Sequence, residues 1–411
     1  MDRPLEGGAP ASAAGGDRQP LICMLLQHHY DNDARVKREA RTLQEEQYRI
    51  HLITLCDEGA VPGIRSDGST RVETLRVRSR GLPRTPFFWL VKYLEFVVRA
   101  AWRAARLRPD VYHAHDLPMV VPAWLASFLH PAPIVYDAHE LYPEMTQPHR
   151  FMGPAWRVVD RWAVHRVAAI IAVNRSRADI MVADYSAPEP VIIPNLPVWI
   201  PMAELPDRHE SPLRRKVHEQ LGRIIPPILL YQGLLGPSRC LDQVVEALAQ
   251  GKTDVVLALL GHHGAYVDHL LEKAVSLGIE DRVLYFGSID SDELKQWTVG
   301  ADAGLVIYAR TPLNNYLCAP NKLFEYCMAG VPVIGCDYPE VRRPLETSAA
   351  GELFEPESPT SIAAAVDRLL GDPERLEEAR QAALELREEH HWGRARDALL
   401  ALYRDVFAKS D

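Results

Sequence analysis

Short apolar runs alternate with amphipathic segments along most of this chain, and this alternation limits the folds that it can adopt. Residues 21–26 form a continuous apolar run, 34–47 carry apolar residues at helical spacing, and 50–55 are apolar again. A run without polar interruption is typical of a strand buried on both faces. The alternation continues through a helical segment at 87–108, a strand at 111–113, a helix at 118–129 and strands at 134–136, 168–173 and 191–193. We therefore predict a mostly parallel sheet with helices on both faces.

A proline-rich stretch interrupts the series and a second series follows it. Residues 195–227 contain six prolines, with one short helix expected between Ser211 as N-cap, Pro212 in the first turn and Gly222 as the stop. Further strands are expected at 228–231, 255–260, 283–286, 304–308 and 331–334, and the end of the chain from Ser358 reads as helical. The sequence thus predicts a second α/β sheet of the same kind.

The length of 411 residues fits two such domains better than one. We expect two doubly wound, Rossmann-like domains that face a central cleft, where ligands bind beyond the carboxyl ends of the strands. The expected divisions are a disordered leader at 1–19, a first domain at 20–200, a connection at 201–226, a second domain at 227–390 and a helical tail at 391–411.

Composition excludes several classes of protein. A net charge of −9 disfavours a general nucleic-acid binder, which needs a broad basic surface. The start of the chain lacks the pattern of a signal peptide, no apolar run reaches the length of a membrane span, and the six cysteines show no C-x-x-C pair. We expect a cytoplasmic protein without nucleic acid as a partner, and without a disulfide framework or a zinc site.

The segment from Cys318 to Gly330 holds the most chemical information. Pro320 suits the first turn of a helix and Gly330 suits its end. Free amides at the helix start, around Ala319 to Lys322, can bind an anion, and the Lys322 ammonium adds a full positive charge. Glu325 lies about 7 Å further along the axis, at 1.5 Å per residue, so its carboxylate can accept hydrogen bonds from a sugar diol. A solvated surface helix is an equally good interpretation of this segment alone.

The ordered motifs of the chain resemble those of family 4 glycosyltransferases, over roughly residues 21–372. P-N-K-L-F-E-Y-C-M-A-G-V-P-V-I is similar to their nucleotide-binding segment, and Y-Q-G-L-L-G-P-S-R-C-L-D to their phosphate loop. D-N-D-A-R-V-K-R-E-A-R-T-L resembles their first helix, while V-Y-H-A-H-D and I-V-Y-D-A-H-E-L-Y-P-E resemble strand ends of their first domain. The resemblance implies the GT-B fold and transfer of a sugar, with retention of configuration, from a nucleoside diphosphate sugar to an acceptor hydroxyl.

The resemblance also implies roles for individual residues. Glu325 would bind the ribose of the donor, Arg239 and Lys322 would hold its diphosphate and stabilise the leaving group, and His139 would lie near the donor sugar. Gly233 and Asn321 would complete the donor site. The implied donor carries UDP, with GDP as the alternative, and needs neither a metal nor a permanently bound cofactor. The implied acceptor is a sugar, a lipid-linked sugar or a small molecule.

Two positions depart from the family pattern. Leu317 stands where many members carry a first glutamate, and Leu234 where the phosphate loop commonly has arginine. These departures motivate one alternative, a non-catalytic nucleotide-binding partner subunit. A sugar-nucleotide epimerase of the same fold is a second alternative.

Two other patterns have structural interpretations that we prefer, whereas for a third the resemblance favours a role in acid–base chemistry. Asp31-Asn32-Asp33 and Asp290-Ser291-Asp292 match a metal-binding D-x-D pattern, but each precedes a helix, where aspartate caps the first turn. His113-Ala114-His115-Asp116 lacks the further ligands of a hydrolase metal site, so we interpret it as a strand-end loop. His139 with Glu140 could form an acid–base pair, and without the resemblance we would treat His139 as an ordinary hydrogen-bonded histidine.

The segment from Arg84 to Arg108 contains six basic residues and one acid. Its apolar face, at helical spacing, consists of Leu90, Leu94, Val97, Val98, Ala101, Trp102 and Ala105. A basic amphipathic helix can lie on an anionic bilayer, as a peripheral contact with the inner face of the membrane. Packing of this face into the protein core is the interpretation that we favour.

Overall fold

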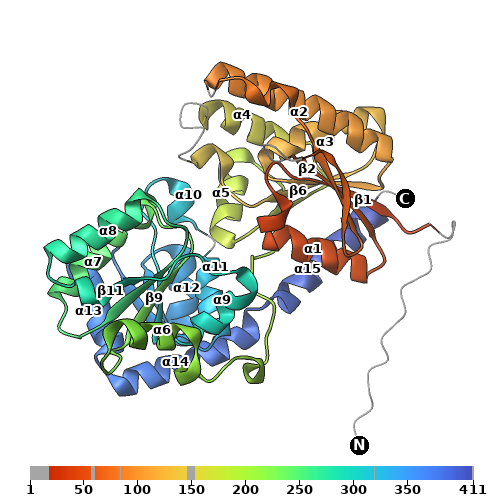
Figure 1. Cartoon of the computed structure of the whole chain (residues 1–411). Helices are drawn as coiled ribbons and strands as arrows, with labels where there is room; N and C mark the ends of the chain where they lie inside the picture. Colours follow the sequence, from red (N-terminus) through yellow and green to blue (C-terminus); the bar gives the residue numbers. More distant parts are fainter. Residues whose placement is uncertain (1–17, 57–60, 84, 146–152, 319, 410–411) are drawn as a thin grey trace, which may run out of the picture. The chain divides into compact units, whose positions relative to one another are not determined.

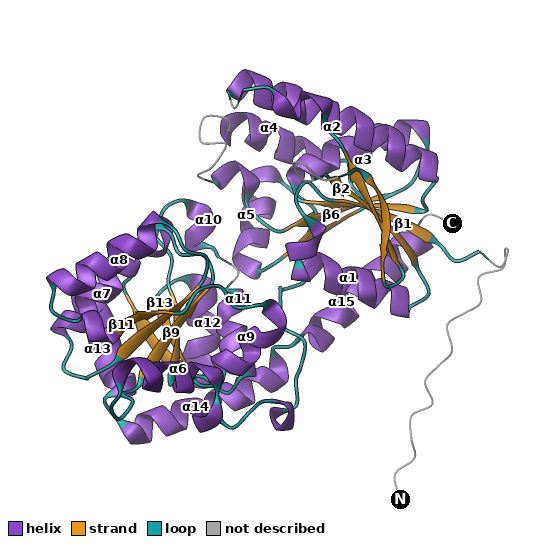
Figure 2. Cartoon of the chain, viewed as in Figure 1, coloured by secondary structure: helices purple, strands orange, loops and turns teal. Residues whose placement is uncertain are grey.

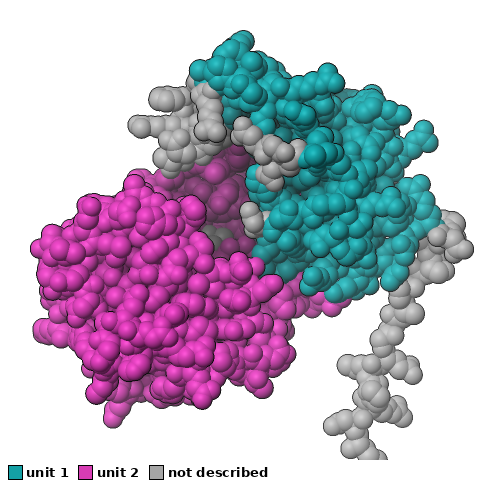
Figure 3. All heavy atoms as spheres, in the orientation of Figure 1, with its two compact units in different colours: residues 1–112, 125–132 teal, residues 113–124, 133–411 magenta. Residues whose placement is uncertain are grey.

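The computed structural model describes residues 18–56, 61–83, 85–145, 153–318 and 320–409. Within these ranges the chain divides into two compact units, one from 1–112 and 125–132 and the other from 113–124 and 133–411 (Figure 3). Most of the expected leader, together with Arg84 and Ala319, lies outside the described residues.

The first sheet has eight strands in the order β3-β4-β2-β1-β5-β6-β7-β8. Its strands are β1 Leu21–Leu25, β2 Arg49–Leu55, β3 Gly63–Asp67, β4 Thr70–Leu75, β5 Val111–His115, β6 Ile134–Ala138, β7 Ala169–Ala172 and β8 Val191–Ile192. β1 pairs with β2 in parallel, with Leu21 opposite Arg49, and every residue of β1 is buried. The apolar run at the start of the chain therefore forms a central strand, as its composition predicts.

Helices connect these strands and cover the sheet. They are α1 Ala34–Glu45, α2 Pro86–Leu107, α3 Leu117–Leu129, α4 Gly153–Ala163 and α5 Arg175–Tyr185. In the first unit, α1 and α2 cover opposite faces of the strands that they connect (Figure 1). α1 begins at Asp33, whose carboxylate accepts a hydrogen bond from the Val36 amide at 3.0 Å. Capping at this position is confirmed, because the side chain satisfies an amide that the first turn leaves free.

The second sheet has six strands in the order β11-β10-β9-β12-β13-β14. They are β9 Ile228–Gln232, β10 Val256–Leu260, β11 Val283–Tyr285, β12 Ala303–Val306, β13 Val333–Cys336 and β14 Gly351–Phe354. All the described pairings in this sheet are parallel. Together the two sheets give the α/β fold class that we expect, with two Rossmann-like parallel sheets.

The helices of the second sheet lie on both of its faces, with α7 and α8 on one and α9, α11 and α12 on the other (Figure 2). The helices beyond β8 are α6 Pro212–Leu221, α7 Leu241–Gln250, α8 Ala265–Ser276, α9 Ser291–Thr298, α10 Leu313–Tyr316, α11 Asn321–Met328, α12 Pro339–Ser348, α13 Pro359–Leu370, α14 Pro373–Glu389 and α15 Trp392–Ala408. α6 lies between Ser211 and Gly222 as expected, and the Ser211 hydroxyl accepts from the Arg214 amide at 3.3 Å.

The last helix returns to the first sheet. The Tyr403 hydroxyl of α15 lies 2.6 Å from Nδ1 of His113 on β5, and the Trp392 amide donates to the Pro197 carbonyl at 2.7 Å. Residues 391–409 thus contribute a buried polar contact to the strand that carries the H-A-H-D motif.

Three strands escape the sequence pattern, namely β3, β4 and β14. β3 pairs antiparallel with β4 at the edge of the first sheet, and all five residues of β3 are exposed. An exposed edge strand needs no apolar run, so a search for buried runs does not detect it. β14 at the edge of the second sheet is only partly buried for the same reason.

The core-packing interpretation of α2 is right for part of its apolar face and wrong for the rest. Val97, Ala101 and Ala105 are buried, as core residues are. In contrast, Leu94 is 51% exposed and Trp102 is 52% exposed, and Leu90 and Val98 are exposed with them. The apolar side of α2 is wider than the part of the helix that packs against the sheet. In the described part of the chain, no helix is both long enough and apolar enough to span a bilayer.

Gly304 on β12 allows the ring of Tyr326 to pack against the strand. A Cβ built at Gly304 would lie 2.2 Å from two ring atoms of Tyr326, which is fully buried. We predict that Gly304→Ala lowers the free energy of unfolding by about 1–3 kcal/mol, the usual cost of overpacking a core. Gly264→Ala is the matched control, because a Cβ there meets no atom within 4 Å. Urea denaturation of both variants measures the effect, and equal stabilities would contradict the proposed packing.

Candidate functional site

The helix that follows Pro320 is tied to the end of strand β9. α11 buries Leu323, Tyr326 and Cys327. The Tyr326 hydroxyl donates to the Leu230 carbonyl at 3.1 Å and accepts from the Gln232 amide at 3.2 Å. These bonds hold the more exposed side of α11, which carries Lys322 and Glu325, at the carboxyl end of the strand, where α/β sheets bind ligands.

The Lys322 ammonium lies among aromatic rings. Nζ is 4.5 Å from the ring centroid of Tyr231 and 5.5 Å from that of Tyr308, and it donates to the Tyr231 hydroxyl at 3.2 Å. Burial, followed by the positive charge of Arg239, lowers the pKa of Lys322 to about 7. Aromatic rings offset only part of the free energy that burial costs the charged amine. A nearby anion would therefore stabilise the charged form strongly.

Arg239 ends the short 3-10 turn Pro237–Arg239, and its guanidinium lies 4.5 Å from the ring centroid of Tyr308. Tyr308 therefore contacts both cations. Nε of Arg239 is buried, and it has no hydrogen-bond acceptor among the described residues. A buried guanidinium donor without an acceptor, next to a second cation, is the arrangement expected of a site for an anion.

Gly233 lies against Lys322 in a conformation that favours glycine. Its φ is +119°, and a Cβ built there would lie 2.8 Å from Cε of Lys322. Any other residue would be strained and would displace the lysine. The neighbouring Leu234, which stands at the position of the expected arginine, is 60% exposed, and its carbonyl accepts from the Tyr231 hydroxyl at 2.7 Å. The loop thus contributes backbone rather than charge next to the lysine.

The carboxylate of Glu325 is held by the last residue of β9. Oε2 accepts a hydrogen bond from Nε2 of Gln232 at 3.0 Å, and Oε1 of Gln232 accepts from the Thr298 hydroxyl at 2.9 Å. Both amide atoms of Gln232 are therefore used, which fixes its orientation. The partly exposed carboxylate is preorganised to accept hydrogen bonds from a ligand.

His139 belongs to a second polar network, beyond the end of β6. Its Nε2 lies 2.7 Å from Oδ2 of Asp137 and 3.3 Å from Nδ1 of His115, and its amide donates to Asp116 at 3.0 Å. The side chain is 13% exposed. Burial, followed by the charge of His113, lowers the pKa of His115 to about 3, so His115 is neutral near pH 7. The network fixes the ring of His139.

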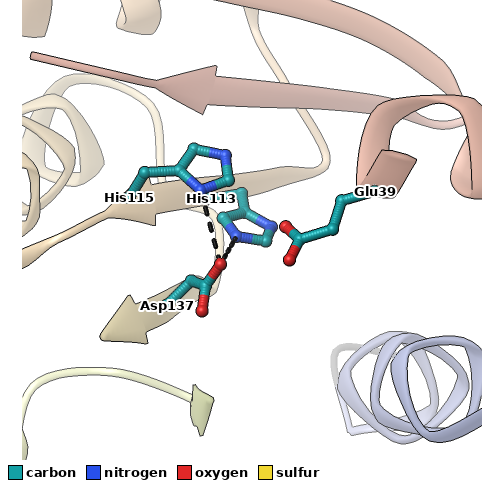
Figure 4. Close-up of side chains that lie close together, drawn as sticks. All are labelled: Glu39, His113, His115 and Asp137. Atoms are coloured by element: carbon teal, nitrogen blue, oxygen red, sulfur yellow. Dashed lines mark ion pairs between the residues drawn. The ribbon is translucent and has the colours of Figure 1, made fainter. Parts of the chain in front are cut away.

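His113, His115 and Asp137 also qualify as metal ligands. All three are fully buried, and Oδ2 of Asp137 lies 3.7 Å from Nε2 of His113 and 3.4 Å from Nδ1 of His115 (Figure 4). The same carboxylate accepts from His139, and His113 contacts Tyr403. Asp137 and His113 thus belong to a buried polar network, and imidazole nitrogens with a carboxylate oxygen are donors of the kind that bind metals.

Arg177 connects the His139 loop with the segment that leads into α11. Its guanidinium donates to the carbonyls of His139 and Asn314, to that of Leu317 at 2.9 Å, and to the Glu140 carboxylate at 2.8 Å. Leu317, at the position of the missing glutamate, is buried and contributes its carbonyl to this contact. Glu140 is therefore paired with an arginine rather than with His139.

The sequence-predicted residues fall into three places. Gly233, Arg239, Lys322 and Glu325 come together around Tyr231 and Tyr308. His139 lies in the network of Asp137. Asn321 lines a cavity of about 250 Å³ with Pro320, Phe324 and Glu340, and the described lining of that cavity does not include Lys322, Arg239 or Glu325.

Sequence reasoning missed the groups that orient the cluster, namely Tyr231, Gln232, Tyr308 and Arg177. Tyr231 and Gln232 directly precede Gly233, at the end of a predicted strand, and that position alone could have marked them.

The capping interpretation of the second D-x-D pattern is not matched by a hydrogen bond, in contrast to the first pattern, where Asp33 caps its helix. Asp290 occupies the N-cap position of α9, but its side chain makes no capping hydrogen bond.

Comparison with known protein families divides the chain at the same place as its two sheets. Residues 33–195 match the glycosyl transferase 4-like domain, and residues 215–386 match the glycosyl transferases group 1 family. The 2-deoxystreptamine glucosyltransferase of Streptomyces kanamyceticus is 26% identical and aligns over 91% of this chain and 98% of its own length. The D-inositol 3-phosphate glycosyltransferase of Nocardia farcinica is also 26% identical, over 80% of this chain and 69% of its own.

Solved structures agree on the fold. Sucrose-phosphate synthase of Thermosynechococcus elongatus superposes with a TM-score of 0.77 at 18% identity, over 95% of this chain and 100% of its own. HepE of Anabaena, in complex with UDP and glucose, gives 0.70 at 17% identity, over 94% and 100% of the two chains. The chain thus has a glycosyl transferase 4-like domain followed by a glycosyl transferases group 1 domain, each on a Rossmann-like sheet. It belongs to the glycosyltransferases with the GT-B fold.

Proposed function

We propose that this glycosyltransferase moves a hexose from a nucleoside diphosphate sugar, with UDP as the nucleotide, to an acceptor hydroxyl with retention of configuration and without a metal. The paired cations Lys322 and Arg239, with the carboxylate of Glu325 on the same side of α11, are the observation that carries the proposal. The complexes of HepE with UDP and with UDP-glucose support UDP over GDP. Retention rests on the family resemblance.

The two cations have a defined role in this mechanism. Cleavage of the glycosidic bond to the diphosphate leaves negative charge on its oxygens. Lys322 and Arg239 stabilise this charge more strongly in the transition state than in the ground state, which is what accelerates the reaction. Their two positive charges support metal independence, because they supply the neutralisation that a divalent ion provides elsewhere.

The remaining residues position the donor. Glu325, oriented by Gln232, accepts hydrogen bonds from the ribose hydroxyls. Gly233 lets the backbone approach the phosphates closely. His139, whose ring Asp137 orients, contacts a hydroxyl of the donor sugar near the reacting carbon. In this proposal residues 227–390 form the donor domain and residues 20–200 the acceptor domain.

The acceptor domain contains a cavity with the chemistry of a sugar site. The cavity, of about 460 Å³, is lined by Trp89, Tyr93, Phe96, Gln27 and Arg80, among others. The rings of Trp89 and Tyr93 are stacked, with centroids 5.4 Å apart. Aromatic faces with a few polar groups are typical of sites for small ligands, so we assign the acceptor to this cavity.

Product analysis tests the reaction itself. Incubation with UDP-hexoses and a panel of sugar, lipid-linked and aminocyclitol acceptors should release UDP in step with a product heavier by one hexose, as mass spectrometry detects. Conversion of the donor sugar without accumulation of UDP would identify an epimerase instead. Tight nucleotide binding without turnover across the panel would identify a non-catalytic subunit.

Removal of the ribose contact should weaken nucleotide binding. We predict that Glu325→Ala raises the Kd for UDP by at least about ten-fold, since charge-assisted hydrogen bonds each contribute about 1.5–3 kcal/mol. Calorimetry measures the change. Glu272→Ala, an exposed carboxylate on α8, is the control and should bind UDP as the unmodified protein does. An unchanged Kd for Glu325→Ala would rule out the ribose role.

Binding of UDP should take up a proton. Because the pKa of Lys322 is about 7, its amine is mostly neutral at pH 8, and a bound diphosphate favours the charged form. UDP affinity should therefore fall as the pH rises above about 7, the pKa of Lys322. Calorimetry at pH 8 in two buffers of different ionisation enthalpy measures the uptake. Lys322→Met should abolish it and Lys216→Met, an exposed lysine of α6, should not. Equal uptake by Lys322→Met would contradict the assignment.

The acceptor assignment predicts a change in KM for one substrate only. Trp89→Ala should raise the acceptor KM about ten-fold, the equivalent of 1.4 kcal/mol, and leave the donor KM unchanged. Steady-state kinetics with the acceptor found in the product assay measures both. Phe128→Ala, a 66% exposed aromatic residue of α3 in the same unit, should change neither value. A rise in the donor KM alone would place the acceptor elsewhere.

A further inference from the structure

The outer face of α2 presents a continuous apolar stripe to solvent. Its members recur every three or four residues, which places them on one side of the helix. They are Phe87 at 69% exposure, Leu90 at 42%, Leu94 at 51%, Val98 at 63% and Trp102 at 52%. From the first to the last the stripe runs about 22 Å along the helix axis, at 1.5 Å per residue. Apolar side chains in such a row normally contact something other than water.

The opposite face of α2 already meets the needs of the core. Phe96, Val97, Ala100 and Ala104 are all buried, with at most 3% exposure. α2 is therefore anchored to its unit without any contribution from the stripe. Among the described residues nothing covers the stripe, so it can make a contact outside the chain, and its removal should leave the fold intact.

Basic side chains accompany the stripe. The Arg106 guanidinium lies 4.5 Å from the ring centroid of Trp102, and Arg99, whose side chain is 36% exposed, lies on the same helix. The other two cations of the helix face its own unit, because Lys92 donates to the Leu82 carbonyl and Arg103 pairs with the buried Glu73 carboxylate. The single acid of the helix, Glu95, is engaged by the Arg99 guanidinium and by two backbone amides. The helix is thus net positive in a chain whose net charge is −9.

This combination of charges and apolar groups identifies the chemistry of the surface that would cover it. An apolar stripe along a helix with cations beside it matches a bilayer interface, where acyl chains meet anionic phosphates. Membrane-surface cations contribute about 1 kcal/mol each near an anionic leaflet. A second copy of this chain would bring the same net positive helix against itself, so charge disfavours self-association through this face.

We infer that the outer face of α2 docks this protein onto the surface of an anionic phospholipid bilayer. The stripe inserts among the acyl chains and the flanking arginines pair with lipid phosphates. The inner face of the same helix contributes Trp89, Lys92, Tyr93 and Phe96 to the cavity of about 460 Å³. Docking would therefore hold that cavity close to the membrane. The inference concerns docking alone and does not depend on the transfer reaction.

Sedimentation with vesicles tests the inference. The full-length protein should bind vesicles of equal parts phosphatidylcholine and phosphatidylglycerol at least about ten-fold more strongly than vesicles of phosphatidylcholine alone, and high salt should weaken the binding. Val98→Glu should lower the bound fraction at least about five-fold, because it places a charge in the acyl region. Val275→Glu is the matched control, since Val275 on α8 is also 63% exposed, and it should bind as the unmodified protein does.

Three outcomes would overturn the inference. One is equal binding by Val98→Glu and Val275→Glu, and another is equal binding to the two kinds of vesicle. The third is a change in molar mass of Val98→Glu by light scattering without a change in vesicle binding, which would make the stripe a surface for self-association. Circular dichroism and UDP affinity check that each variant is folded. If Val98→Glu does not fold, the milder Leu94→Gln should show the same selective loss, and its absence would also overturn docking.

Discussion

The proximity of two cations beside the Tyr308 ring is the constraint on which this account depends. Lys322 and Arg239 repel each other, and burial raises the cost of charging Lys322. The faces of two tyrosine rings and a nearby carboxylate offset part of this cost. The lowered pKa of Lys322 indicates that its charged form is still less stable here than in water. In the proposed function, a bound diphosphate stabilises the charged form of Lys322. The unfavourable electrostatics of the free site would then become binding energy for a doubly charged leaving group.

The fold places this cluster through backbone contacts more than through side-chain charges. Tyr326 fixes α11 against β9, and the left-handed Gly233 gives the lysine its space. Arg177 reaches four groups in two loops and so links the polar network of His139 to the segment that precedes α11. A change at Tyr326 or Arg177 would therefore disturb the site without touching a residue that contacts substrate in the proposed function.

Much of this architecture could be predicted from sequence because buried parallel strands have a strong apolar signal. Central strands such as β1 and β9 were predicted within one residue at each end. The exposed strand β3 carries no such signal. Hydrogen bonds between side chains that are distant in sequence leave no periodic pattern either. Gln232 illustrates this limit, since its role depends on Glu325 and Thr298, which are distant in sequence. The exposure of Val98 on α2 likewise depends on how much of the helix the sheet covers, which periodicity cannot reveal.

A crystal structure of the protein with UDP would test the central claim most directly. The account predicts that the diphosphate lies within hydrogen-bonding distance of Nζ of Lys322 and Nε of Arg239, with both ribose hydroxyls donating to Glu325. Nucleotide bound elsewhere, or a diphosphate that contacts neither cation, would contradict it.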